Sequence, residues 1–247
     1  MHVIELLGLL GFGSFLAVSL VLGLRLLALA RRTRLLPEWA MGLNFLLAGF
    51  VGYGLLLASE SLRLVPEPWD RFGSFVGVTS ISAGALFVGL FTARVFRPGR
   101  RSAQIALAAL AAWLVLGIAG SWWLHVAGVD AGARGWLGRW APNVGLLVAY
   151  AWASAEPLHY QRALRRRARM GLAPADVAIR MLLWGAGSLA IAAIAAVHLA
   201  AQLAGRYELP PALVGLVSLL ALGTAIAEWL AFFPSRAARR LRSAAAP

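Results

Sequence analysis

Long apolar runs, each ended by charged or polar residues, dominate the pattern along this chain. A helix that crosses a membrane needs about 20 predominantly apolar residues, and these runs meet that length. We expect seven helices at 3–30, 39–58, 72–95, 103–128, 141–160, 177–205 and 211–233. The pattern therefore predicts an all-α membrane protein, a seven-transmembrane helix bundle that forms a single domain over residues 1–235.

The composition agrees with this interpretation. Apolar residues make up 61% of the 247 residues and charged residues only 13%, whereas soluble domains are nearer half apolar and a quarter charged. Cysteine is absent, which excludes disulfides, thiolate catalysis and cysteine-ligated metals. The first residues carry no basic segment and the first apolar run is long, so we expect no cleaved signal peptide.

The net charge of +13 comes from arginine alone, because all 23 basic residues are arginines. Most lie in four clusters at every second loop: Arg31, Arg32 and Arg34; Arg94, Arg97, Arg100 and Arg101; Arg162, Arg165, Arg166, Arg167 and Arg169; Arg236, Arg239, Arg240 and Arg242. This positive-inside pattern predicts an amino terminus outside and a carboxyl terminus in the cytoplasm, with 236–247 as a short arginine-rich tail. The charge therefore orients the protein, and we expect no nucleic-acid partner.

Two stretches suggest an internal repeat. Residues 31–50 read RRTRLLPEWAMGLNFLLAGF, and residues 166–187 read RRARMGLAPADVAIRMLLWGAG. In both, a basic turn leads to a proline and then an acidic residue, and the helices that follow are similarly spaced. The pattern is compatible with a 3+1+3 arrangement of parallel repeats, as in some transporters. Proline and an acidic residue also commonly begin helices, so both interpretations stay open.

Ionisable side chains within membrane spans are costly, so each is a candidate functional residue. The candidates for a polar network in the cytoplasmic half are Asn44, Glu156, His159, Tyr160, Arg180 and Glu228. Arg180 is the expected counter-ion of Glu156 or Glu228. We favour an ion-pair latch that pins the helices at their inner ends over a proton or substrate path, although a latch that opens is also a switch.

A second group of polar residues lies in the outer half of the predicted bundle. Its members are Glu5, His125, His198 and Gln202. His198 and Gln202 are four residues apart on one helix, which predicts that they line a pocket open to the outside. Two histidines could hold haem or a metal, but no HxxxH or HExxH pattern is present. We therefore expect no metal and no cofactor.

Three stretches resemble uncharacterised bacterial proteins with seven membrane spans. They read RRTRLLPEWAMG at 31–42, FTARVFRPG at 91–99 and AWASAEPLHYQRALRRRARMGLAPADVAIRMLLWG at 151–185. The resemblance implies the architecture and a bacterial inner membrane, but no chemistry. In topology alone the chain is similar to rhodopsins, although without lysine it cannot form a retinal Schiff base. SWEET and PQ-loop transporters also have seven helices, in the 3+1+3 arrangement considered above for this chain.

Three functions follow as hypotheses. The leading one is a receptor-like or sensor-like bundle that binds a small or lipidic ligand and signals through a cytoplasmic protein partner, with its arginine-rich face on membrane lipids. The second is a small-solute transporter with a site near the midplane. The third and least favoured is an intramembrane enzyme acting on lipid, because the spans contain no aspartate and few histidines. We therefore expect that the protein is not an enzyme.

Overall fold

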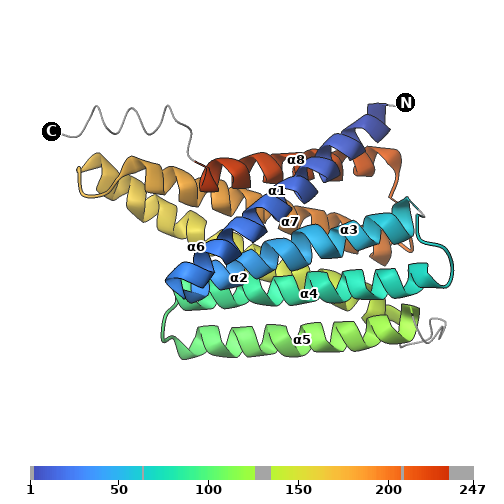
Figure 1. Cartoon of the computed structure of the whole chain (residues 1–247). Coiled ribbons are helices and arrows are strands. Elements are labelled where there is room, and N and C mark those ends of the chain that lie inside the picture. Colours follow the sequence, from blue (N-terminus) through green and yellow to red (C-terminus); the bar gives the residue numbers. More distant parts are fainter. Residues whose placement is uncertain (1–2, 63, 126–134, 207–208, 234–247) are drawn as a thin grey trace.

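The computed structural model describes residues 3–62, 64–125, 135–206 and 209–233, and these fold into helices and connecting turns without a strand (Figure 1). The elements are α1 (Val3–Thr33), α2 (Leu36–Asn44), η1 (Phe45–Gly52), α3 (Tyr53–Leu56), η2 (Leu57–Ser61), α4 (Trp69–Phe96), α5 (Arg101–His125), α6 (Gly135–Arg169), α7 (Ala175–Leu203) and α8 (Pro211–Phe232). Elements α2 to η2 follow without a break and form one helix with two wide π-helical stretches. The prediction of seven helices is confirmed for the described residues.

Six of these helices are long and apolar enough to cross a membrane: α1, the α2–η2 helix, α4, α5, α7 and α8. The chain is therefore a multi-pass membrane protein. Helix α6 is long but is not among these six helices. Its apolar sequence is interrupted by prolines, an asparagine, a glutamate and a terminal group of arginines. It packs against α4, α5 and α7, whereas its terminal arginines are exposed.

The bounds of α6 correct the expected span at 141–160. The helix begins six residues earlier, at Gly135, and continues to Arg169. Pro157 does not end it, because a proline removes only one backbone N–H from the ladder. Arginine is a good helix former, so the cluster at 162–169 lies on the last turns of the helix and not in a loop.

Successive helices run in alternating directions, and α1 crosses the others obliquely (Figure 1). Helices α1, α4, α6 and α8 all end at the same end of the bundle, which carries Arg31, Arg32, Arg94 and the arginines of α6. We call this the arginine end. Three exposed tryptophans lie towards the opposite end, on α4 and α5: Trp69, Trp122 and Trp123. The tail at 236–247 lies outside the described residues.

Glycines allow close contact between helices at both edges of the bundle. A Cβ atom on Gly11 of α1 would collide with the backbone carbonyl of Ser218 on α8, and Gly120 of α5 lies equally close to the backbone of Gly138 on α6. Close approach of this kind replaces the hydrophobic effect as a source of helix association in a lipid environment. The packing fixes α6 between its neighbours and positions the side chains described next.

Candidate ligand-binding site

A cavity of about 380 Å³ opens between the helices at the end opposite the arginines. Its polar lining consists of Tyr53, Glu60, Ser61, Asn143, His198 and Gln202. Its apolar lining includes Phe12, Leu56, Leu57, Val78, Ile81, Pro142, Leu146 and Ala195. We call this space the outer cavity. The structure thus places His198 and Gln202 in one cavity, together with polar groups from α6 and from the α2–η2 helix.

Two of the cavity's polar groups hold each other. The Asn143 side-chain amide of α6 donates to the Gln202 carbonyl oxygen of α7 across 3.1 Å. The His198 ring lies 2.9 Å, through Nδ1, from the Ile194 carbonyl of its own helix. Because a carbonyl only accepts hydrogen bonds, Nδ1 carries the hydrogen, and in the neutral ring Nε2 is then an acceptor. The cavity therefore presents an amide pair beside an imidazole with fixed orientation.

The wide turns of the α2–η2 helix supply one wall of the outer cavity. Tyr53 and Leu56 belong to α3, and Leu57, Glu60 and Ser61 belong to η2. A π-helical stretch inserts one residue more per turn than an α-helix, and such stretches are frequent at functional sites. Tyr53 also packs edge-on against Phe15 of α1, with ring centroids 5.6 Å apart. The Tyr53 ring therefore forms part of the floor of the cavity.

A further polar group lies deeper in the bundle. The Tyr150 hydroxyl of α6 donates to the Asn44 side-chain carbonyl across 2.8 Å, and both residues are buried. Glu228 of α8 is only 5% exposed, and its Oε2 atom has no hydrogen-bond partner within the described chain. Of the six inner candidates, Asn44 and Glu228 are the two that are buried, and Tyr150 joins them without having been predicted.

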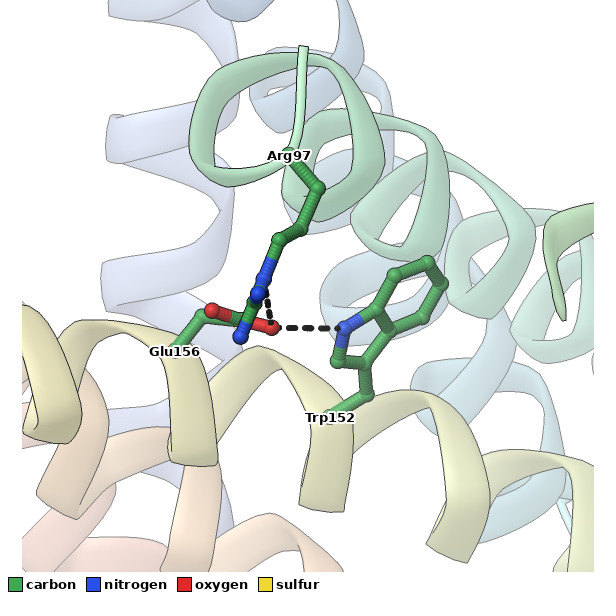
Figure 2. Close-up of polar contacts among 3 residues, drawn as sticks. All are labelled: Arg97, Trp152 and Glu156. Carbon is green, nitrogen blue, oxygen red and sulfur yellow. Dashed lines mark hydrogen bonds and ion pairs between the residues drawn. The ribbon is translucent and has the colours of Figure 1, made fainter. Parts of the chain in front are cut away.

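The prediction that Arg180 is the counter-ion of Glu156 is wrong. Glu156 Oε1 accepts from Arg97 Nε at 2.8 Å and from the Trp152 indole N–H at 3.3 Å (Figure 2). Arg97 follows the last residue of α4, so its long side chain reaches across to α6. Arg180 instead lies 3.8 Å from Asp176, one turn earlier on α7. The ion pair between α4 and α6, which we call the clamp, was therefore missed because Arg97 lies in a turn outside the predicted spans.

The other inner candidates lie away from the clamp carboxylate. His159 and Tyr160 are both exposed on α6, and the Tyr160 ring contacts Phe96 edge-on at 6.2 Å. Of the outer candidates, Glu5 and His125 have side chains outside the described part of the structure. The sequence places Trp152 and Glu156 four residues apart, and this spacing does bring the indole to the carboxylate.

An aromatic layer closes the bundle near the arginine end. Trp184 of α7 contacts Phe45 of η1, Phe91 of α4 and Phe232 of α8, with ring centroids 5.5–6.4 Å apart. Beneath it lies a cavity of about 300 Å³ that is also lined by Glu38 and Arg180. These aromatic residues come from four segments far apart in the sequence, and no periodicity within one helix predicts that they meet.

Comparisons of the chain with known protein families, with curated proteins and with solved structures found no match. Functional inference therefore rests on the geometry of the cavities and on the polar side chains around them.

Proposed function

We propose that this protein is a receptor-like or sensor-like membrane protein that binds a small molecule in the outer cavity. The observation that carries the proposal is the convergence of six polar side chains, from three of the long helices, on one space of about 380 Å³ with otherwise largely apolar walls. Binding pockets for small molecules have this size and this mixture of apolar surface with a few placed polar groups. The role proposed is binding and not catalysis.

The lining indicates the chemistry of the ligand. The amides of Asn143 and Gln202 offer both donors and acceptors, His198 offers an acceptor at Nε2, and Phe12, Leu56 and Ile81 offer apolar surface. Such a site suits a small amphipathic molecule that carries a hydroxyl or amide group. In this proposal the arginine end faces the cytoplasm, as the positive-inside rule favours, so the ligand would enter from outside.

Helix α6 offers a physical route from ligand to cytoplasm. It carries Asn143 at the outer cavity and Glu156 at the clamp, about 20 Å apart at a rise of 1.5 Å per residue. A ligand that competes for the Asn143 amide would bias the position of α6 and thereby the Arg97–Glu156 contact. In this proposal a cytoplasmic protein reads the state of the clamp at the arginine end.

A ligand screen on the purified full chain tests the proposal. The protein in lipid nanodiscs would be heated with each member of a broad library of small amphipathic compounds, and unfolding would be followed by intrinsic tryptophan fluorescence. A binder should raise the unfolding temperature of the wild type and of His159→Ala, but not of His198→Ala. His159 is the matched control because it is an exposed histidine outside the cavity. A library without any stabilising compound would count against the proposal.

A small-solute transporter is the second candidate, and the buried polar residues favour it. Tyr150, Asn44 and Glu228 lie in the bundle interior, between cavities near its two ends, and intramembrane carboxylates commonly mark ion or substrate paths. A 3+1+3 repeat would fit this role. Solute uptake into proteoliposomes that is lost in Glu228→Gln would support transport. A flat trace across a broad solute panel would argue against it.

A further inference from the structure

A third cavity, of about 410 Å³, lies between α6 and α7 at the arginine end. Helix α6 contributes Gln161, Arg165 and Arg169, and helix α7 contributes Ala178, Ile179 and Leu182. None of these residues lines the outer cavity or belongs to the clamp or the aromatic layer. The function proposed above leaves this space unexplained.

The polar part of the lining has no partner among the residues that the structure describes. Arg165 and Arg169 are one helical turn apart and exposed, and in the described chain neither is paired with a carboxylate. Gln161, one turn earlier on α6, is only 6% exposed, and its amide makes no hydrogen bond to the described residues. Within the described chain, two guanidinium groups without a carboxylate partner and one amide without a hydrogen bond therefore line the same space.

The apolar part of the lining continues along the outer surface of α7. Ile179, Leu182 and Leu189 are all exposed, and their spacing of three and then seven residues keeps them on one face of the helix. This face leads from the arginines towards the middle of the bundle. In a membrane-spanning helix it meets the hydrocarbon chains of lipids.

We propose that this cavity is a binding site for an anionic phospholipid. Arg165 and Arg169 would hold the phosphate, the Gln161 amide would donate to a headgroup or ester oxygen, and one acyl chain would lie along Ile179 and Leu182. Guanidinium groups bind phosphate through paired charge-assisted hydrogen bonds, and basic pockets between helices at the cytoplasmic side bind lipid headgroups. An acidic protein segment would satisfy the arginines but would leave the apolar face at membrane depth uncovered.

Native mass spectrometry of the purified full chain tests this proposal. The delipidated protein would be titrated with nanodiscs made of either phosphatidylglycerol or phosphatidylcholine. The number of lipid molecules bound to each protein would then be counted. Arg165→Gln/Arg169→Gln should weaken the tightest phosphatidylglycerol binding roughly tenfold or more, because each arginine near the membrane surface contributes several-fold. The matched control is Arg162→Gln/Arg166→Gln, which removes the same charge with the same spacing from residues of α6 that do not line the cavity. It should change binding less than threefold or so.

Three outcomes would overturn the proposal. An equal loss in both double variants would show that phosphatidylglycerol responds only to the overall surface charge. Binding of phosphatidylcholine as tight as that of phosphatidylglycerol would remove the role of the arginines. Full competition by soluble glycerol phosphate would assign the site to a free phosphate compound and not to a lipid. Gln161→Leu, which keeps both arginines, should weaken binding by a few-fold, and an unchanged affinity would contradict the placement of the headgroup.

Discussion

The outer cavity and the clamp lie towards opposite ends of the same helix, α6, and differ in what surrounds their polar side chains. At the outer cavity, Asn143 and its neighbours surround an open space. At the clamp, Glu156 meets a guanidinium and an indole. A polar residue within a membrane bundle is therefore not a functional site by itself. Asn143 and Gln202 bond each other but also border an open space, so they remain accessible to a ligand, whereas the polar atoms of the clamp line no such space.

The comparison predicts that substitutions near the arginine end reduce stability, whereas substitutions at the outer cavity reduce binding. The largest expected effect is that of Trp184→Ala, since Trp184 joins three other rings in the aromatic layer. Removing a buried tryptophan should lower the free energy of unfolding by about 3 kcal/mol. Reversible unfolding in mixed micelles measures this loss. Trp123→Ala, at an exposed tryptophan of α5, should cost far less, and equal losses would contradict the assignment.

The next effect is expected at the buried hydrogen bond between Tyr150 and Asn44. Tyr150→Phe leaves the Asn44 carbonyl oxygen without its donor at 2.8 Å, and an unsatisfied buried acceptor costs about 1–2 kcal/mol. The same unfolding measurement tests this value. Tyr160→Phe removes the same hydroxyl from an exposed tyrosine and should be nearly neutral. A neutral Tyr150→Phe would imply that this hydrogen bond is not a source of stability.

The clamp should contribute a smaller, charge-dependent term. A double-mutant cycle of Glu156→Gln and Arg97→Gln should give a coupling free energy of about 1 kcal/mol, because the pair is only partly buried. The coupling should decrease at high salt, since Arg97 is reachable by solvent. Zero coupling at low salt would show that the two side chains do not stabilise each other. Arg180→Gln with Asp176→Gln provides a reference cycle within one helix.

The smallest effect on stability is expected at the outer cavity. Asn143→Ala removes one hydrogen bond at the edge of an open space, and such bonds between membrane helices average about 0.6 kcal/mol. Binding of any compound found in the ligand screen should nevertheless fall by tenfold or more, because the amide pair is broken. A variant that loses stability but keeps its affinity would reverse the comparison between the two ends.

The sequence predicted the helices better than it predicted their contacts. Apolar runs between charged residues are a local signal, so all seven helices were expected near their observed positions. Helix α6 was expected too short, because the arginines at 162–169 look like a stop signal although the helix continues through them. The spacing of His198 and Gln202 indicated one face of α7, and the structure places both in the outer cavity. Asn143, which completes this group from another helix, carries no local signal of its role.

The partners of charged residues depend on tertiary packing and could not be predicted from position along the chain. Arg180 and Glu156 have similar depths in the predicted topology, yet Arg180 finds Asp176 on its own helix. Arg97 reaches Glu156 from a turn because α4 and α6 pack together. The two π-helical stretches likewise contain no proline, and the glycines of η1 resemble those of the ordinary helix α1, so the sequence does not mark them, although η2 lines the cavity.

Cysteine accessibility tests the central claim most directly, because the chain has no native cysteine. Gln202→Cys would be treated with a membrane-impermeant maleimide in right-side-out and in inverted membrane vesicles. Ala149→Cys, at a fully buried position of α6, and Arg166→Cys, at the arginine end, serve as controls. A cavity open to the outside predicts labelling of Gln202→Cys only in right-side-out vesicles and of Arg166→Cys only in inverted ones. Labelling of Gln202→Cys only from the inverted side, or from neither side, would contradict it.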